Sequence, residues 1–259
     1  MTRLAAANIW CWGWLAVLSA AALMAAPLWL LLGLVRGRGL TRGAREGIWL
    51  YGRAYLFLIR PFVKVRLREG EAAEAGPASI IVMNHQSWLD IYVLGLVREA
   101  REACFLVRAW PFRRLFFFRP LMRLAGYIET EGVEAEAVFI RCRSELRSGS
   151  CLVCFPEGAR SPDGRLGRFH SGVFKLAVEA GRAVRPLAVF GSGQVMPKGS
   201  LIFRPGAIEI KELPPAAPAR FAGEAIVHGA MRRFVRLRFI RALEKPETNE
   251  GACSCQEKK

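Results

Sequence analysis

The chain has 259 residues, of which 53% are hydrophobic before its 25 glycines are counted. This apolar content excludes intrinsic disorder for most of the chain, and the length fits one principal domain with attached segments. The formal net charge of +16 favours anionic partners such as a phospholipid surface, nucleic acid, an acidic protein or a phosphorylated small molecule. Seven cysteines in a chain of this size argue against a disulfide scaffold and for a reducing compartment.

The first segment is an uncharged apolar run from Leu4 to Val35. A bilayer core of about 30 Å needs only about 20 helical residues, so this run is long enough to span a membrane. Three tryptophans lie near its start, and several arginines follow its end while only Arg3 precedes it. This bias predicts a membrane-bound protein whose following domain lies on the cytoplasmic side.

This segment has two other interpretations. A cleaved signal peptide is disfavoured, because Pro27 and a further apolar stretch follow the small alanines, as suits an anchor. Pro27 also lacks a backbone N–H, and it could split the run into a helical hairpin that dips into one leaflet without crossing. Hydropathy alone favours a membrane-spanning helix and a hairpin within one leaflet equally.

Residues 36–60 mix arginine, glycine and aromatic side chains and predict an interfacial helix that leads into the soluble part. Apolar and basic residues alternate after Pro61, which predicts a half-exposed strand. Strands are expected at 63–67, 78–83, 104–107, 151–155, 184–190 and 207–211, and helices at 88–97, 110–124, 133–147, 171–180 and 221–243. Strands that alternate with helices predict an α/β fold.

His85 and Asp90 form the first candidate site. His85 follows the predicted buried strand, and Asp90 comes five residues later. Five residues turn a regular helix through about 140°, so the side chains can meet only if His85 precedes the helix and Asp90 lies in its first turns. The carboxylate then accepts the Nδ1 hydrogen and leaves Nε2 free as a base. The alternative is a histidine bonded to its own loop, with Asp90 as an early-helix charge.

The second candidate site is the stretch Phe155-Pro156-Glu157-Gly158-Ala159-Arg160-Ser161. Proline and glycine turn the chain off the preceding strand and present Glu157 and Arg160 at the carboxyl edge of the sheet, where α/β folds bind ligands. An arginine there suits a phosphate, because its guanidinium donates two parallel hydrogen bonds. The alternative is an ordinary solvated turn.

Together the two segments resemble the glycerolipid acyltransferase family, of the lysophosphatidate (1-acyl-sn-glycerol-3-phosphate) acyltransferase type. The family's first motif, Asn-His-x4-Asp, is met by Asn84, His85 and Asp90. Its third, Phe-Pro-Glu-Gly-Thr-Arg-Ser, is met everywhere except at Ala159, and a fourth, hydrophobic-x-Pro, is matched at Pro186. The resemblance covers roughly residues 60–215. It implies an α/β fold with a central mixed sheet flanked by helices, next to the N-terminal membrane helix or helical hairpin.

The resemblance also implies a reaction. His85, oriented by Asp90, takes the proton from the free hydroxyl of lysophosphatidate, which attacks the thioester of acyl-CoA or acyl carrier protein and forms phosphatidic acid. N–H groups at the start of the next helix stabilise the oxyanion. Glu157 and Gly158 hold the glycerol part of the acceptor, and Arg160 holds its phosphate. The substrate-binding residues expected in full are Asn84, Glu157, Gly158, Arg160, Ser161 and Pro186. No residue becomes acylated, and no metal or other cofactor is expected.

One position departs from the family pattern. The family's second motif ends in a phosphate-binding arginine, and Gly132 stands at that place here. Arg123 or Arg141 could substitute for it in space. Otherwise the acceptor phosphate has fewer contacts, or the acceptor is a different lysolipid such as a lyso-ornithine lipid.

The predicted organisation has three parts: a membrane anchor and interfacial helix at 1–60, an acyltransferase domain at 61–244 and a polar tail at 245–259. Aromatic and basic residues interleave over 108–123, which favours anionic lipid headgroups over nucleic acid. The expected partners are a membrane phospholipid surface, lysophosphatidate and an acyl thioester, with acyl carrier protein as an alternative donor and no nucleic acid. A non-catalytic membrane-binding relative is the remaining alternative.

Overall fold

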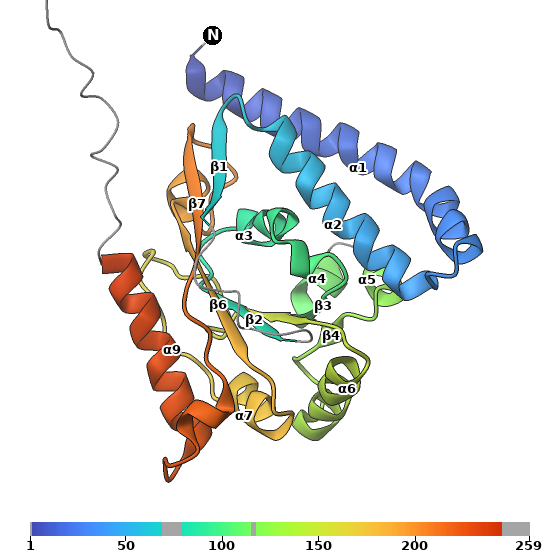
Figure 1. The fold of residues 1–259 in the computed structure, drawn as a ribbon. Coiled ribbons are helices and arrows are strands. Elements are labelled where there is room, and N and C mark those ends of the chain that lie inside the picture. The colour runs from blue at the N-terminus through green and yellow to red at the C-terminus, as the bar shows by residue number, and fades with distance from the viewer. Residues whose placement is uncertain (1, 69–78, 115–117, 245–259) are drawn as a thin grey trace, which may run out of the picture.

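The computed structural model describes residues 2–68, 79–114 and 118–244, so the tail predicted at 245–259 lies outside the described residues. Its centre is a seven-stranded sheet in the order β1-β7-β6-β2-β5-β3-β4 (Figure 1). The strands are β1 Val63–Arg68, β2 Ile80–Met83, β3 Cys104–Val107, β4 Ile128–Glu129, β5 Leu152–Cys154, β6 Val184–Phe190 and β7 Gly206–Glu212. Neighbouring strands pair in parallel except β6 and β7. The predicted mixed α/β sheet is confirmed.

Helices cover both faces of this sheet. They are α1 Arg3–Val35, α2 Leu40–Leu58, α3 Leu89–Val93, α4 Ala109–Arg114, α5 Arg119–Leu124, α6 Ala135–Arg147, α7 Gly172–Glu179, α8 Ser192–Val195 and α9 Val227–Glu244. Short 3-10 turns follow at Leu94–Leu96, Arg98–Ala100 and Pro218–Phe221. Figure 1 shows α1 and α2 on one side of the sheet and α9 on the other.

Alternate residues of the central strand β2 face two hydrophobic cores, as the pleat of a strand requires. Ile81 packs in a core with Tyr55 of α2 and Val93 of α3. Ile80 packs in a second core with Phe239 of α9, together with residues of α6 and α7. The sheet is therefore a buried middle layer, and the carboxyl end of β2 emerges between the two helical layers.

The apolar N-terminal run forms one continuous helix, α1, of 33 residues with Pro27 inside it. At about 1.5 Å per residue it is about 50 Å long. It is long and apolar enough to cross a membrane by length and composition. The alternative in which Pro27 splits the run is not present, since α1 continues through Pro27 and packs along α2. A helical hairpin is present instead between α1 and α2, which turns at residues 36–39.

The helical hairpin is attached to the sheet domain near the start of α1 and through α2, and its two helices are bonded to each other. Near its start, Asn8 exchanges two hydrogen bonds of 2.9 Å with the backbone of Phe203. Near its end, Trp29 Nε1 donates to the carbonyl oxygen of Gly43 in α2 at 2.9 Å. Tyr55 of α2 is fully buried in the core of the sheet domain. The hydrophobic core thus continues across residue 60, where the predicted division between anchor and domain falls.

The helix predicted at 221–243 begins only at Val227, and two other predicted helices are interrupted. The helix predicted at 88–97 ends at Val93 and continues as 3-10 turns, where Gly95 approaches α2 so closely that a Cβ would stand 2.5 Å from the backbone nitrogen of Arg53. The helix predicted at 110–124 is divided into α4 and α5. The two-residue strand β4 was not predicted, because a strand so short has no detectable period.

Candidate active site

The imidazole of His85 lies just after β2 and contacts the first turn of α3. Its Nδ1 lies 2.8 Å from Oδ2 of Asp90, whose side chain is fully buried. The same oxygen accepts hydrogen bonds from the backbone N–H groups of Gln86 at 2.7 Å and Ser87 at 2.8 Å. This oxygen accepts from two backbone N–H groups and faces Nδ1 as an acceptor, so the imidazole hydrogen lies on Nδ1 and Nε2 is available as a base. The geometry expected from the five-residue spacing is present.

The N–H groups before and at the start of α3 are already engaged. Those of Gln86 and Ser87 donate to Asp90, and that of Leu89 donates to Oγ of Ser87 at 3.2 Å. The expectation that N–H groups at the start of this helix stabilise an oxyanion stays a prediction, and these three groups are used by the side chains of Asp90 and Ser87. They hold Asp90, and through it His85, in place.

Two further residues of the motifs position the loop that carries His85. The side-chain amide of Asn84 is buried and exchanges hydrogen bonds with the backbone of Val189, at 2.9 Å and 2.7 Å. The backbone N–H of Ser161 donates to the carbonyl oxygen of His85 at 2.7 Å, and its hydroxyl donates to Asp163. Both residues tie the end of β2 to neighbouring segments; their predicted contact with substrate stays a prediction.

Glu157 joins the two motifs. Its Oε1 accepts the backbone N–H of His85 at 2.8 Å, and its Oε2 accepts that of Gly167 at 2.7 Å. Burial raises the pKa of the Glu157 carboxyl above its ordinary value, and these two hydrogen bonds oppose the rise. Both oxygens are used by the backbone, so the structure makes Glu157 a positioning residue for His85. Its predicted contact with the acceptor's glycerol part stays a prediction.

A cavity of about 520 Å³ lies between the helical hairpin and the sheet, and His85 lines it. The other walls are mostly apolar and aromatic and come from α1 to α5, for example Leu18, Trp29, Tyr51 and Met122. The ring of Phe155 stacks on the imidazole at 4.0 Å between centroids. An apolar cavity with a base at one end suits a substrate that has a hydrocarbon chain and one reactive polar end.

Arg160 also lines this cavity. Its guanidinium lies 5.1 Å from the ring centre of Trp88, and its Nη1 is buried with no hydrogen-bond partner among the described residues. Burial lowers the pKa of this guanidinium, and the charge of Asp90 opposes the shift. A buried unsatisfied donor is costly, and a ligand phosphate would satisfy it.

Arg108 does not line this cavity, but it contacts the loop of the second motif and was not predicted from the sequence. It follows β3, and its guanidinium donates to the carbonyl oxygen of Gly158 at 3.3 Å and pairs with Glu131 at 2.7 Å. Its signal in the sequence was a cation directly after an apolar strand. Gly132 stands in the loop beyond β4 with a positive φ of 75°. Arg141, by contrast, contacts the carbonyl oxygen of Gly126 at 3.5 Å.

The remaining predicted residues lie in different places. Gly158 has a φ of 72°, and a Cβ there would stand 3.3 Å from the His170 ring, so the turn requires glycine. Pro186 is buried in β6 opposite Val82 and does not line the cavity beside His85. Its predicted role as a substrate wall stays a prediction. Among the described residues, no group of three His, Cys, Asp or Glu side chains is placed to hold a metal ion.

Comparisons with known proteins place this geometry in a family. The acyltransferase family model matches residues 64–190. A chloroplastic 1-acyl-sn-glycerol-3-phosphate acyltransferase of Arabidopsis thaliana is 34% identical over 153 residues, which are 55% of this chain and 40% of that protein. A lyso-ornithine lipid O-acyltransferase of Pseudomonas aeruginosa is 34% identical over 114 residues, 42% of this chain and 41% of that protein. This chain thus spans less than half the length of either relative.

The fold has a counterpart among solved structures. The crystal structure of PlsC, the 1-acyl-sn-glycerophosphate acyltransferase from Thermotoga maritima, matches with a TM-score of 0.69 at 22% identity, and covers 95% of this chain and 98% of that chain. This chain shares the fold of that structure, and the matched family model confirms the resemblance drawn from the motifs. Residues 64–190, which contain His85, Asp90 and Glu157, match the acyltransferase family model.

Proposed function

We propose that this chain is an enzyme that transfers a fatty acyl group from a thioester to the free hydroxyl of 1-acyl-sn-glycerol-3-phosphate, forming phosphatidic acid in phospholipid biosynthesis. The observation that carries the proposal is the His85–Asp90 pair at 2.8 Å beside an apolar cavity that Arg160 also lines. The matched acyltransferase family and the Arabidopsis thaliana relative support it.

The reaction follows from the protonation state of the pair. Nε2 of His85 takes the proton of the acceptor hydroxyl as the hydroxyl oxygen attacks the thioester carbonyl. The tetrahedral intermediate expels the thiolate, which takes the proton back from His85, and an ester replaces the thioester. Asp90 holds the imidazole in the required tautomer and offsets its transient positive charge. In this scheme no side chain is acylated and no metal or cofactor takes part.

The acceptor's phosphate has two candidate cations. Arg160 presents a buried, unsatisfied Nη1 at the cavity, and Arg108 contacts the same loop at Gly158. Arginine suits a phosphate because its fork donates two parallel hydrogen bonds. Arg108 therefore takes, in this proposal, the part that the sequence left open when Gly132 replaced the family arginine.

The contacts of α1 support a particular placement at the membrane. Near its start α1 is bonded to the sheet domain at Phe203, and its middle and end are bonded to α2, at Tyr51 through Ser19 at 2.8 Å and at Gly43. α2 in turn packs in the core of the sheet domain. A helix that crossed the bilayer would separate these partners. The proposal is that α1 lies in one leaflet, with the catalytic domain on the cytoplasmic face. Labelling of a cysteine introduced at Thr2 tests it: an impermeant thiol reagent added from the non-cytoplasmic side should leave that cysteine unmodified.

The activity is tested by thiol release from a long-chain acyl-CoA by the detergent-solubilised protein, with and without lysophosphatidate. Release that depends on the acceptor and is lost in His85→Ala supports the proposal. A folded His85→Ala variant, checked by thermal unfolding, that retains wild-type release would refute the assigned base. A folded wild-type protein with no release from acyl-CoA or acyl carrier protein would refute the activity.

A second candidate is transfer to a lysolipid without a phosphate ester at that position, such as a lyso-ornithine lipid. Gly132 in place of the family arginine and the Pseudomonas aeruginosa relative favour it. Arg108→Ala and Arg160→Ala distinguish the two. With a phosphate acceptor, each should raise the KM for the acceptor by about tenfold or more, since charged hydrogen bonds are lost. Activity that survives both substitutions unchanged would favour the second candidate.

A further inference from the structure

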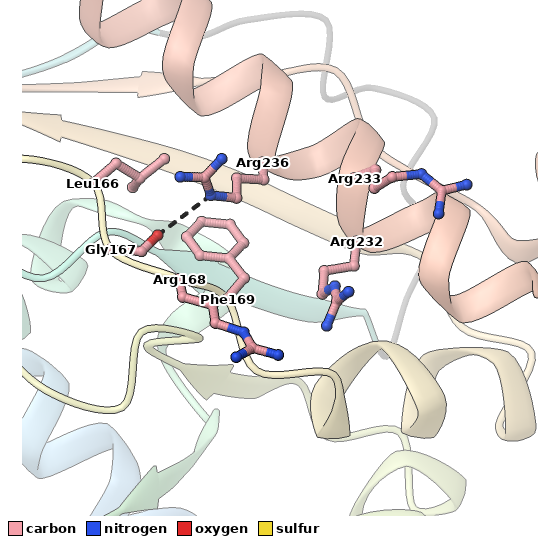
Figure 2. A pocket seen from close by; sticks show the side chains of 7 residues that line it. All are labelled: Leu166, Gly167, Arg168, Phe169, Arg232, Arg233 and Arg236. Carbon is pink, nitrogen blue, oxygen red and sulfur yellow. Dashed lines mark hydrogen bonds between the residues drawn. The ribbon is translucent and has the colours of Figure 1, made fainter.

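A second cavity, of about 320 Å³, lies outside the site described above (Figure 2). Its walls are the segment 166–169 and the facing side of α9, and four of its seven lining residues are arginines: Arg168, Arg232, Arg233 and Arg236. Figure 2 shows Arg168 and Arg232 extending into the space between the segment and the helix, while Arg233 extends away from Arg232. None of the described residues that line this cavity is acidic.

The positive charge of these arginines is poorly compensated within the described residues. Arg168 and Arg232 have no ion pair there, and Arg233 has only Glu224 at 3.9 Å, with both side chains more than half exposed. Arg232 and Arg236 are four residues apart on α9, a spacing at which like charges destabilise a helix. A concave site that gathers guanidinium groups against this repulsion has the chemistry of a phosphate-binding site.

The position of the cavity indicates which kind of phosphate compound can reach it. α9 covers the face of the sheet opposite α1 and α2 (Figure 1), so the arginines do not face the side on which the proposed membrane helix lies. A lipid headgroup within that membrane would not reach them. The phosphate of the acceptor is assigned to Arg108 and Arg160 beside His85. The ligand of the arginine cavity is therefore a soluble anion distinct from the acceptor.

Hydrogen bonds connect this cavity to Glu157 and, through it, to His85. Nε of Arg236 donates to the carbonyl oxygen of Gly167 at 3.4 Å, and the N–H of Gly167 donates to Glu157 at 2.7 Å. The other carboxylate oxygen of Glu157 accepts the N–H of His85 at 2.8 Å. Arg236, Gly167 and Glu157 thus form a chain of hydrogen bonds between this cavity and His85. This connection favours a ligand that takes part in the reaction.

We propose that the arginine cavity binds the phosphates of the nucleotide part of coenzyme A, so that the donor is acyl-CoA. This inference rests on the proposed acyl transfer, since that reaction requires an anionic thioester donor. The concave shape suits a small molecule with several phosphates better than the flat acidic surface of a carrier protein. Arg168 and Arg232 would contact the phosphates directly, and Arg236 would connect them to Gly167.

The test is calorimetric titration of the full-length, detergent-solubilised protein with free coenzyme A, 3′-dephospho-coenzyme A and pantetheine, which lacks phosphates. Coenzyme A should bind at least about tenfold more tightly than pantetheine, with the dephospho form between them. The variant Arg168→Ala/Arg232→Ala should lose at least about tenfold in coenzyme A affinity and leave pantetheine binding unchanged. Arg241→Ala removes the same charge on an exposed part of α9 outside the cavity and should stay within about twofold of wild type.

The outcomes separate this inference from the proposed function. Phosphate-dependent binding through the arginines with no acyl transfer would sustain the cavity assignment and refute the enzyme. Acyl transfer from acyl-CoA whose KM for the donor is unchanged in the double variant would refute the cavity assignment alone. If coenzyme A does not bind, and transfer from acyl carrier protein depends on Arg168 and Arg232, the nucleotide proposal is wrong and the surface belongs to a protein donor.

Discussion

Asp90 is the residue that fixes the orientation of the His85 imidazole. One carboxylate oxygen accepts hydrogen bonds from the imidazole of His85 and from two backbone N–H groups. The other oxygen is buried without a hydrogen-bond partner among the described residues. A buried charge in this position is costly unless the donors around it are fixed. The loop from Asn84 to Ser87 is held at Val189 and Met196, which keeps those donors in place.

Asp90→Asn should lower kcat by about 10²–10⁴, because the amide cannot accept three hydrogen bonds and hold the Nδ1 tautomer. The KM values for donor and acceptor should change little, since Asp90 does not line the cavity. Steady-state kinetics with both substrates measures the split, and thermal unfolding confirms that the variant is folded. A folded variant with a kcat within threefold of wild type would contradict the role.

Glu157 gives a pH dependence with a definite sign. Burial raises the pKa of its carboxyl above the ordinary 4.5, so its contribution to the free energy of unfolding is fully present below that pH. The contribution is lost as the pH rises through the raised pKa, because the charged form is penalised in the folded state. The stability difference between wild type and Glu157→Gln should therefore shrink from pH 4.5 upwards. Thermal unfolding of both proteins across pH 4 to 7 measures it; a difference that grows with pH would contradict the assignment.

Among the elements, α2 has the contact that sets the cavity's shape. It packs on the 3-10 turn at Leu94–Leu96, where Gly95 lies against the backbone of Arg53. The close approach ends α3 after five residues and places its first turn under His85. The same helix carries Tyr51 into the cavity wall. A sequence pattern predicts helices one at a time and does not contain this contact.

Gly95→Ala should lower the free energy of unfolding by about 1–3 kcal/mol, because the added Cβ meets backbone that cannot move aside. Gly13→Ala is the matched control: it lies in α1 with nothing within 4 Å of the new Cβ, and it should be neutral or slightly stabilising. Differential scanning fluorimetry in detergent compares the two. Equal melting temperatures for both variants would show that α2 and the turn can separate.

At the scale of the whole molecule, the outer face of α1 is apolar and exposed. Leu28 is 61% exposed and Leu31 is 56% exposed, and they lie three residues apart on one side of the helix. The opposite side of the molecule carries the arginines of α9. The molecule thus has an apolar side that suits a lipid phase and a basic side that suits a soluble anion.

Leu28→Glu/Leu31→Glu should weaken partition onto phospholipid vesicles by at least about tenfold, because each leucine contributes about 1.5–3 kcal/mol when buried. Ile140→Glu, a similar aliphatic residue on α6 that is 55% exposed, is the control and should partition as wild type does. Vesicle flotation measures the bound fraction. Equal flotation of all three proteins would show that α1 is not the membrane contact.

The local pattern of the sequence determined most of the elements. The strands at 104–107 and 184–190 were predicted with the bounds they have, because short apolar runs between turn residues are local signals. The His85–Asp90 contact was also predictable. Because the two residues are five positions apart, their side chains can meet only if His85 precedes the helix and Asp90 lies in its first turns. Both motifs lie directly after strands, where the carboxyl edge of the sheet brings them together.

Only the tertiary structure decided the rest, because the partners are far apart in the chain. Arg108 and Gly158 meet because β3 and β5 are neighbours in the sheet, which no spacing reveals. The path of α1 along the domain depends on contacts with residues as distant as Phe203. The arginine cavity exists because α9 packs beside the segment 166–169. Charges and apolar runs are properties of the sequence, whereas the surfaces that they form depend on packing between distant segments.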